Sequence, residues 1–366
     1  MHNNNIGIDA RPLEGNVSGI GRFLLDTIQS IINSNKNINL FLFSHCKIDI
    51  PESIDARRIR NVVLPGNKFL YDIFLPFYVR KYKIESYLGY NQSIPLWGAK
   101  KRILYIYDMG VYIVPETFSL KWRLYIKFWI ILSAKLADKI ITISHTSKND
   151  IKSILKVKDD KIIVVYPWYA NRFQALAQNI PFRNKKIVQI NKPYILFVGT
   201  IKKRKNIERL LIGFQQLIHE HTINVDIVLA GKIAGGKEAV DIPSDPRLQE
   251  RIHFLGYVND EELDYLYRNA KLFVYPSLYE GFGIPILEAM SYGLPVLASN
   301  VGSIKEIIED AGLLFDPTNT AEIATGFYSL LKNEDNITQI IIKAGYKRLK
   351  YFDKSISEEI LQKLFN

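Results

Sequence analysis

The chain alternates short runs of β-branched and other apolar residues with longer stretches whose apolar positions recur every three or four residues. The short runs predict buried β-strands, and the longer stretches predict amphipathic helices. Strands are predicted at Ile6–Asp9, Ile38–Phe43, Arg102–Tyr107, Lys139–Ile143, Lys161–Tyr166, Tyr194–Val198, Val225–Ala230, Ile252–Leu255, Leu272–Tyr275 and Pro295–Ala298. Helices are predicted at Ile20–Ile32, Leu120–Leu136, Ile207–Ile218, Glu261–Arg268 and Pro285–Tyr292. Strands that alternate with helices indicate an α/β protein with parallel, doubly wound sheets.

The pattern repeats in two halves, which predicts two Rossmann-like domains facing a central cleft. We expect an N-terminal domain over residues 1–172, a linker over 173–192 and a C-terminal domain over 193–345. Residues 346–366 are expected to form a C-terminal helix that packs back on the N-terminal domain.

Five residues are typical of helix ends. Asn259, followed by Glu262, predicts a capping box, and Asn206 is placed to cap the helix after it. Pro285 suits the first turn of its helix, and Gly293 suits the end of the same helix.

Composition agrees with a two-domain globular protein. The 366 residues are 48% hydrophobic and 23% charged, and this length suits two cores better than one. The single cysteine, Cys46, excludes an internal disulfide and fits a reducing compartment. The first residues do not resemble a signal peptide, and no apolar run approaches the roughly 20 residues of a membrane helix. We therefore expect a cytoplasmic protein, at most peripheral on the inner face of the cytoplasmic membrane.

The net charge of +11 favours an anionic partner, although a chain this rich in Lys, Asn and Ile also acquires such a charge from composition alone. The basic residues are dispersed and no nucleic-acid module is recognisable, so no nucleic-acid partner is expected. The sequence contains no D-x-D pair and no histidine cluster with metal spacing. We expect no metal and no cofactor.

A glycine-started loop, GTIKKRKN, joins a predicted strand to a predicted helix after Val198. Backbone N–H groups at the helix start, with Arg204 and Lys205 beside them, form a suitable site for a diphosphate. Taken alone, the loop is explained equally well as a solvated basic turn.

The stretch YEGFGIPILEAM places Glu280 in a loop and Glu288 eight positions later, in the expected first turn of the next helix. Gly281 and Gly283 allow the backbone to approach a ligand closely. One carboxylate suits sugar hydroxyls and the other suits a nucleotide ribose. Alternatively, Glu288 only stabilises the helix N-terminus.

Two segments of the first half carry weaker signals. Gly19 and Gly21 permit a tight turn where a phosphate approaches, or simply a packing turn. Tyr107 and Asp108 follow a strand at the edge where open α/β sheets bind ligands; they orient a sugar, or Asp108 caps a turn.

Together these segments resemble the retaining glycosyltransferase family four, glycosyl transferases group 1, with the GT-B fold. PSLYEGFGIPILEAMSYGLPVLAS is similar to the family signature, and VGTIKKRKNIERLL is similar to its donor phosphate loop. GIDARPLEGNVSGIGRFLLDTI and ADKIITISHTSKNDI are similar to a subgroup rich in mannosyl and related transferases of bacterial surface polysaccharides.

The resemblance implies a metal-independent hexosyltransferase that retains the anomeric configuration, with a nucleotide-sugar donor and a glycan or lipid-linked glycan acceptor. The leaving phosphate would take the acceptor proton. The residues implied in donor binding are Gly19, Gly21, Gly199, Arg204, Lys205, Val258, Glu280, Gly281, Phe282, Gly283, Ile284 and Glu288. Those implied in catalysis are Glu280, Arg204, Lys205 and Asp108. Those implied in the sugar or acceptor pocket are Tyr107, Asp108 and Ser144.

One position departs from the family pattern, because Tyr107 occupies the place of a histidine that helps to hold the donor sugar. The first expectation is mannose from GDP-mannose. Alternatives are a deoxysugar donor such as dTDP-rhamnose, a soluble transferase with a small acceptor, a sugar-nucleotide isomerase and a non-catalytic subunit of a glycan-assembly complex.

Two stretches interleave aromatic and basic residues, FSLKWRLYIKFWIILSAKLADK and KFLYDIFLPFYVRKYK. Such surfaces suit shallow contact with an anionic membrane that carries a lipid-linked acceptor. Alternatively, each helix buries its aromatic residues in the domain core.

Overall fold

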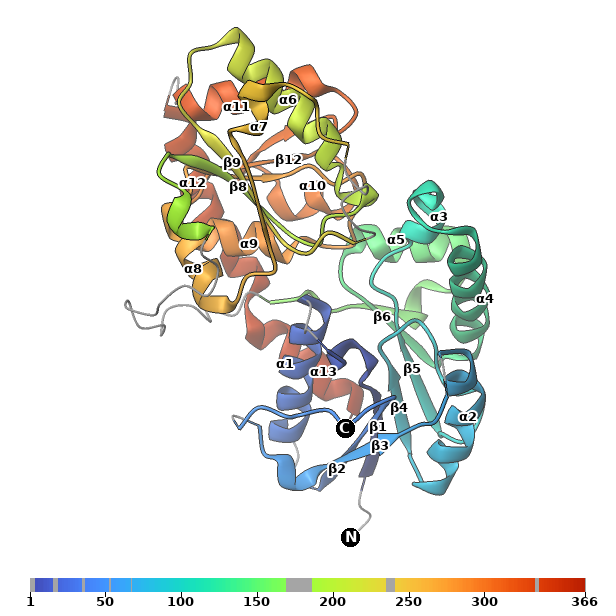
Figure 1. Ribbon diagram of the computed structural model, residues 1–366. Helices are drawn as coiled ribbons and strands as arrows, with labels where there is room; N and C mark the ends of the chain where they lie inside the picture. Colours follow the sequence, from blue (N-terminus) through green and yellow to red (C-terminus); the bar gives the residue numbers. More distant parts are fainter. Residues whose placement is uncertain are drawn as a thin grey trace. The chain divides into compact units, whose positions relative to one another are not determined.

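A computed structural model of the protein describes residues 4–15, 19–34, 37–52, 54–66, 68–168, 186–234, 241–332 and 336–365. The chain divides into two compact units (Figure 1). Unit 1 contains residues 1–168 and 354–366, and unit 2 contains residues 169–353. The predicted linker, residues 173–192, lies largely outside the described residues.

Unit 1 is built on a parallel seven-stranded sheet in the order β3-β2-β1-β4-β5-β6-β7. Its strands are β1 (Asn4–Asp9), β2 (Ile38–Ser44), β3 (Ile59–Val63), β4 (Ser86–Gly89), β5 (Lys101–Tyr105), β6 (Lys139–Thr142) and β7 (Ile162–Val164). Its helices are α1 (Gly19–Ser34), α2 (Lys68–Lys81), α3 (Gly110–Ile113), α4 (Leu120–Leu136), α5 (His145–Leu155) and α13 (Lys354–Phe365).

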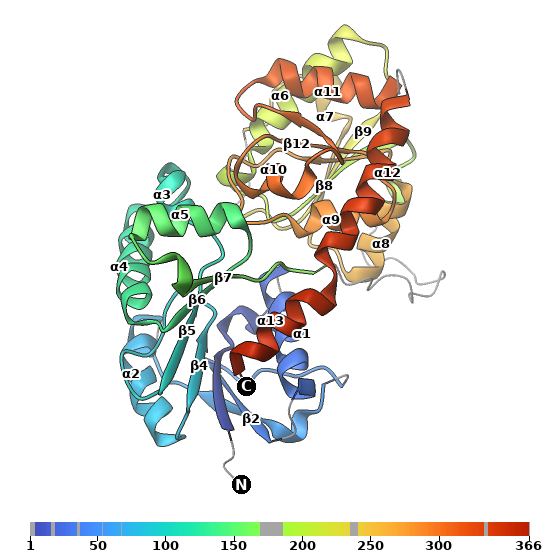
Figure 2. The ribbon, with the colours of Figure 1, turned by 180° about the vertical axis from the view of Figure 1, so that it is seen from behind.

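Helices cover both faces of this sheet. Leu75 of α2 and Ile130 of α4 pack into one buried cluster with Phe43 and Leu104 of the strands. On the other face, α1 and α13 lie side by side (Figures 1 and 2). Helix α13 buries Leu361, Leu364 and Phe365 and belongs to unit 1.

Unit 2 is built on a parallel six-stranded sheet in the order β10-β9-β8-β11-β12-β13. Its strands are β8 (Tyr194–Val198), β9 (Asp226–Ala230), β10 (Ile252–Gly256), β11 (Leu272–Tyr275), β12 (Val296–Ser299) and β13 (Leu313–Phe315). Its helices are α6 (Ile207–Glu220), α7 (Pro246–Gln249), α8 (Asp260–Asn269), α9 (Ile284–Ser291), α10 (Gly302–Ile308), α11 (Thr320–Lys332) and α12 (Ile337–Leu349).

The structure confirms the predicted two-sheet α/β class and corrects several details. Strands β3, β4 and β13 were not predicted from the sequence. Strand β4 is a four-residue segment without β-branched residues, whereas β3 and β13 are short edge strands. Strand β5 ends at Tyr105, so Tyr107 lies in the following loop.

The capping box of Asn259 and Glu262 is confirmed, because each side chain accepts a hydrogen bond from the backbone N–H of the other. The capping role predicted for Asn206 is wrong. Asn206 precedes α6 in a left-handed conformation (φ 57°), and its side chain makes no cap hydrogen bond. Among the described residues, no helix combines the length and the apolar character needed to cross a membrane.

Candidate functional site

The strand order of unit 2 places a topological switch point between β8 and β11. From β8 the chain moves outward to β9 and β10, and it then returns to β11 on the opposite side of β8. Ligands of open α/β sheets bind beyond the carboxyl ends of the strands at such a point. The loop after β8 carries Arg204 and Lys205, and the loop after β11 carries Glu280.

These three side chains form one buried charged cluster. The Lys205 Nζ atom lies 2.7 Å from Glu280 Oε1, and Arg204 Nη2 lies 3.6 Å from Glu280 Oε2. Lys205 and Glu280 are each only 7% exposed. The Lys205 ammonium also donates a 2.7 Å hydrogen bond to the hydroxyl of Tyr275 at the end of β11.

The two charges stabilise each other's ionised form. Burial alone lowers the pKa of Lys205, but the neighbouring Glu280 carboxylate and Tyr275 raise that pKa above its ordinary value of 10.5. Burial alone raises the pKa of Glu280, but Lys205 and Arg204 bring that pKa below its ordinary value of 4.5. With all three groups ionised, the cluster carries one net positive charge (+1 +1 −1).

Backbone contacts hold the two loops together. Leu278 N donates to Arg204 O at 2.9 Å. The Asn206 side chain donates to the carbonyl oxygens of Pro276 and Pro317 at 3.1 and 2.7 Å. Asn206 therefore fixes the loops after β8, β11 and β13. Its Oδ1 atom accepts a 3.0 Å hydrogen bond from Arg209 Nη1 instead of one from the backbone of α6.

Gly199 makes room for the lysine at the start of the loop. Its φ of +152° is one that residues with side chains rarely adopt. A Cβ atom there would lie 3.6 Å from Lys205 Cε and 3.3 Å from the ring of Phe197. A side chain at this position would therefore strain the backbone and crowd the cluster.

The carbonyl oxygen of Glu280 is held by the start of α10, which the sequence analysis did not single out. Ser303 Oγ donates to this oxygen at 2.9 Å. A Cβ atom on Gly302, whose φ is +53°, would lie 2.9 Å from the same oxygen. In the sequence, the small residues Gly302 and Ser303, which follow a predicted strand, were the signal that could have indicated this contact.

The sequence predicted that Glu288 lies in the first turn of its helix, and this prediction is wrong. Helix α9 begins at Ile284, which makes Glu288 its fifth residue and leaves no acidic residue in the first turn. Instead, its Oε2 atom accepts a 2.9 Å hydrogen bond from Tyr267 OH of α8. The described partner of this carboxylate therefore lies on α8 and not at the start of α9.

The remaining candidates of unit 2 surround these elements. Gly281, Phe282 and Gly283 are buried between β11 and α9, and Ile284 is half-buried at the start of α9. Val258, 9% exposed, follows the carboxyl end of β10. The candidates of unit 2 thus all follow the carboxyl end of a strand.

The candidates of unit 1 follow the strands of the other sheet. Gly19 and Gly21 lie inside the first turn of α1, so they form part of a helix rather than the expected turn; residues 16–18 lie outside the described residues. Ser144 is the N-cap of α5 and accepts a hydrogen bond from Ser147 N at 2.9 Å. Asp108 Oδ1 accepts one from Gly110 N at 2.8 Å.

Tyr107 is 8% exposed, and its hydroxyl has no hydrogen-bond partner among the described residues. Its ring packs beside those of Tyr90 and Tyr105, with centroid distances of 6.1 and 4.8 Å. Burial raises the pKa of Tyr107 well above its ordinary value. The Tyr107 side chain is therefore neutral at physiological pH.

Two Rossmann-like units, with a cationic cluster at the switch point of the second sheet, define the GT-B class of glycosyltransferases. The chain matches the family model "Glycosyl transferases group 1" over residues 180–348. It is therefore a retaining glycosyltransferase.

One curated relative is similar over most of the chain, and two solved structures share its fold. The chain is 29% identical to O-antigen chain mannosyltransferase B of Escherichia coli, over 93% of this chain and 94% of the relative. Its fold is similar to that of WaaG, a glycosyltransferase of lipopolysaccharide biosynthesis (TM-score 0.73, 15% identity, 99% and 98% of the two chains). It is equally similar to that of Anabaena HepE in complex with UDP-glucose (TM-score 0.73, 16% identity, 98% of each chain).

Proposed function

We propose that the protein transfers a hexose, with mannose from GDP-mannose as the first candidate, to a lipid-linked glycan during synthesis of a bacterial surface polysaccharide such as O antigen or capsule. The observation that carries the proposal is the buried cluster of Arg204, Lys205 and Glu280 at the switch point. Support for the sugar comes from the E. coli relative, which is named an O-antigen mannosyltransferase.

In this proposal, each charged group of the cluster has a separate role. The cationic groups of Arg204 and Lys205 bind the donor diphosphate and stabilise the negative charge that develops on it as the glycosidic bond breaks. The Glu280 carboxylate accepts hydrogen bonds from hydroxyls of the donor sugar. The leaving phosphate takes the acceptor proton, so no general base of the protein is required.

The proposal is tested first by donor binding and then by transfer. The melting temperature is measured without metal in the presence of GDP, UDP and dTDP and of their sugar conjugates, because a ligand that binds only the folded state raises it. We expect a selective rise with one nucleotide, followed by formation of an α-linked product from the matching α-linked donor. No rise with any nucleotide would overturn the proposal and favour a non-catalytic subunit.

The proposed role of Glu288 as the ligand of the ribose hydroxyls leads to a prediction for Tyr267. Changing Tyr267 to Phe removes the hydrogen bond that orients Glu288, so the Kd of the nucleoside diphosphate should rise about threefold to tenfold. The preference for ribose over 2′-deoxyribose nucleotides should fall with it.

Isothermal titration with both nucleotides measures this effect. Tyr292→Phe is the matched control, because Tyr292 stacks on Tyr267 but donates its hydroxyl to Asp264. An unchanged ribose preference in Tyr267→Phe would contradict the assigned role of Glu288.

Tyr107 gives the second donor candidate, a deoxysugar nucleotide such as dTDP-rhamnose. Its neutral, bulky ring, whose hydroxyl has no partner among the described residues, stands where the family resemblance implies a histidine, a smaller group that titrates near neutrality. We expect Tyr107→His to shift the ratio of kcat/KM between mannose and deoxysugar donors towards mannose by about tenfold or less, the size of one hydrogen bond. Tyr105→Phe, one ring away, is the control. An unchanged ratio would exclude a role of Tyr107 in donor selection.

A lipid-linked acceptor requires contact with a membrane, and α4 carries a surface that suits it. Leu120, Leu124 and Phe128, one stripe on this helix, are each 60% exposed, and Ile131 continues the stripe at 43%. Globular helices normally present polar residues to solvent.

The neighbouring α2 also exposes Phe77. Both helices carry exposed basic residues, namely Arg80, Lys81, Lys121 and Lys135. Apolar and basic groups together favour an anionic lipid surface.

The double change Leu124→Ser and Phe128→Ser should lower partition onto vesicles with anionic lipids by at least about tenfold, because two large apolar side chains no longer enter the interface. Co-sedimentation at low and high salt measures it. Ile340→Ser on α12, where Ile340 is 63% exposed, is the matched control. Salt-insensitive or absent vesicle binding of the unchanged protein would favour the soluble transferase instead.

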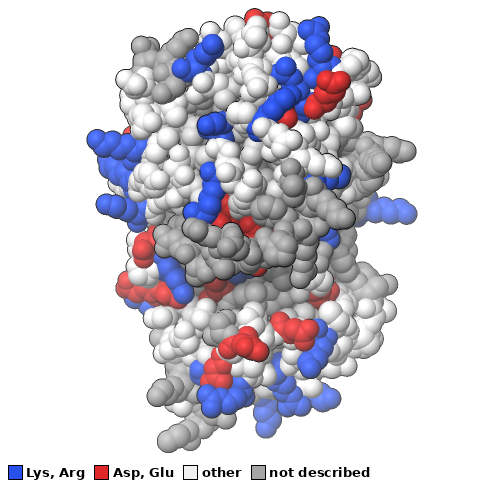
Figure 3. Space-filling model, turned by 60° about the vertical axis from the view of Figure 1, so that its left-hand side comes forward, with Lys and Arg blue, Asp and Glu red and all other residues white. Residues whose placement is uncertain are grey.

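Nucleic acid remains the least favoured partner. On the face drawn in Figure 3, the Lys and Arg side chains lie in separate small groups with acidic side chains between them. A nucleic-acid surface normally concentrates them in a patch or stripe.

A further inference from the structure

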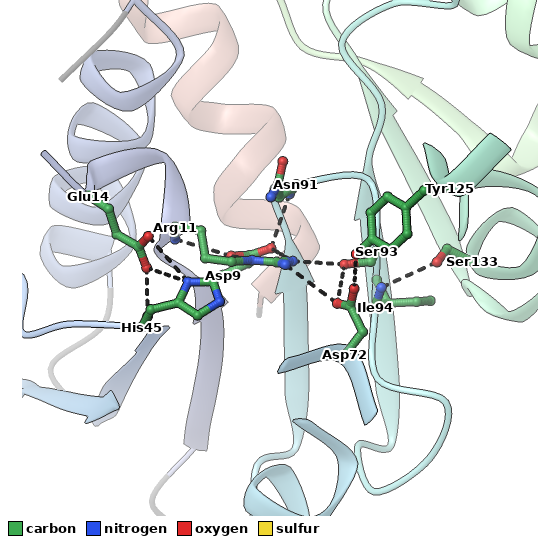
Figure 4. A network of polar contacts seen from close by, with 10 residues as sticks. All are labelled: Asp9, Arg11, Glu14, His45, Asp72, Asn91, Ser93, Ile94, Tyr125 and Ser133. Carbon is green, nitrogen blue, oxygen red and sulfur yellow. Dashed lines mark hydrogen bonds and ion pairs between the residues drawn. The ribbon is translucent and has the colours of Figure 1, made fainter. Parts of the chain in front are cut away.

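Unit 1 has a topological switch point of its own, between β1 and β4. The loop after β1 carries Arg11, and the loop after β4 carries Asn91 to Ser93. Figure 4 shows Arg11 reaching across this point, from the end of β1 towards Ser93 and towards Asp72 of α2.

The charged groups at this point carry no positive excess. The Arg11 guanidinium donates to both carboxylate oxygens of Asp9, at 2.9 and 2.7 Å, and lies 3.5 Å from Asp72 Oδ1. Arg11 also donates to Ser93 Oγ at 2.8 Å, and Ser93 in turn donates to Asp72 at 2.8 Å. One cation beside two carboxyl groups leaves no excess positive charge, so this network does not favour a phosphate group.

A pocket opens beside this network, and aromatic and amide side chains line it. Asn91 and Gln92 contribute from the loop after β4, and Trp122, Tyr125 and Trp129 contribute from α4. The rings of Trp122 and Tyr125 stack at 5.3 Å, and that of Tyr125 lies 6.5 Å from that of Trp129. Tyr125 is fixed by donating its hydroxyl hydrogen to Asp72.

Two features of the lining point to a ligand with hydroxyl groups. Trp129 is only 5% exposed, yet its Nε1–H has no acceptor among the described residues. An indole N–H can only donate, and leaving it unpaired in the interior is costly. Gln92 adopts a left-handed conformation (φ 61°) that is rare outside glycine and asparagine, and such strain concentrates at binding sites.

We propose that this pocket binds one sugar ring, whose apolar face lies on the aromatic rings of α4 and whose hydroxyls bond to Trp129 Nε1 and to the amides of Asn91 and Gln92. Aromatic rings offer an apolar surface of fixed geometry, and carboxamides both donate and accept, as hydroxyls require. Its assignment as the terminal sugar of the acceptor glycan rests on the proposed function; the pocket itself does not.

The test uses the whole protein and the methyl glycosides of mannose, glucose, galactose, rhamnose and N-acetylglucosamine, without any nucleotide. Saturation-transfer NMR measures the Kd of each glycoside. Trp129→Phe keeps an aromatic ring and removes the N–H, whereas Asn91→Ala removes an exposed amide. Trp168→Phe is the matched control, because Trp168 is also buried with an unpaired Nε1–H but packs on Phe23 away from the pocket.

We expect saturable binding of at least one glycoside, about threefold to tenfold weaker in both Trp129→Phe and Asn91→Ala, and unchanged in Trp168→Phe. Absence of saturable binding, equal affinities in all variants, or displacement of the glycoside by inorganic phosphate would each overturn the proposal. Because no donor is present, the result stands apart from the proposed function. If the protein transferred sugar but bound no glycoside, the sugar-binding role of this pocket would be refuted and the proposed function would stand.

Discussion

Replacing Lys205 by alanine is expected to reduce sugar transfer by about 10²- to 10³-fold, the typical cost of removing one group that stabilises developing charge. The same change should lower stability. Lys205 is buried, and its removal leaves Glu280 without the cation that lies 2.7 Å away. Breaking a buried pair in this way costs roughly 3–5 kcal/mol; Arg204, 3.6 Å from the same carboxylate, offsets part of that cost.

Two further variants separate lost stability from lost catalysis. Lys203→Ala removes an exposed lysine of the same turn and should leave both the melting temperature and transfer unchanged. The double change Lys205→Ala with Glu280→Gln removes both buried charges, so it should regain part of the melting temperature but none of the activity. Recovery of transfer in the double variant would refute the role of Lys205 in charge stabilisation.

The pH range over which the pair stabilises the fold follows from its two pKa shifts. The pKa of Lys205 is raised, so its contribution is complete below the ordinary value of 10.5 and is lost as the pH rises through the raised pKa. The pKa of Glu280 is lowered, so its contribution is complete above the ordinary value of 4.5 and is lost as the pH falls through the lowered pKa. The difference in melting temperature between the unchanged protein and Lys205→Ala should therefore be constant around neutral pH.

The central strands were predictable because burial on both faces gives a continuous apolar run. β8 and β11 begin and end at the predicted residues, and they are the two strands that flank the switch point of unit 2. β4 occupies a similar central place in unit 1, yet its residues Ser86–Gly89 lack the β-branched pattern. Its place is set by pairing with β1 and β5, a tertiary effect that local pattern does not encode.

Within the site, the residue types predicted which side chains could bind a donor, but they did not predict which side chains contact one another. Arg204, Lys205 and Glu280 were expected to bind one donor, and the structure brings them together. Tyr275 and Ser303 were missed, because a strand-end tyrosine and a helix-start serine have many possible roles until the neighbouring loops are placed.

The network of Asp9, Arg11 and Asp72 was also not predicted, because Asp72 lies far from the other two residues in the chain. Asp9 and Arg11 lie in the stretch GIDARPL, which the sequence analysis compared with relatives without assigning either residue a role. Asp72 lies 61 positions after Arg11 in the chain, on α2. The aromatic and basic residues of this helix were interpreted as a membrane-contacting surface, and Asp72 itself was given no role. These groups come together because β1 and β4, distant in the chain, pair side by side at the switch point.

Glu280→Gln should separate sugar transfer from diphosphate binding. The substitution keeps the shape of the side chain and removes its charge, so the net charge of the cluster rises from +1 to +2 (+1 +1 −1 against +1 +1). We expect the affinity for a nucleoside diphosphate to be retained or to increase up to about tenfold, because Arg204 and Lys205 are released from a competing anion. Transfer should fall by about 10²-fold or more, since the proposed contact with the sugar hydroxyls loses its ionic acceptor.

Stability supplies the sharper readout of the same variant. Without the carboxylate, Lys205 is a buried cation whose described hydrogen-bond acceptor is the Tyr275 hydroxyl, so the melting temperature should fall. A bound diphosphate replaces the missing anion, and saturating nucleotide should therefore raise the melting temperature of Glu280→Gln by more than that of the unchanged protein. Glu250→Gln, at an exposed position after α7, is the control and should show the unchanged rise. If nucleotide instead stabilised Glu280→Gln less than the unchanged protein, Glu280 would be needed to build the diphosphate site, and its proposed contact with the donor sugar would lose its support.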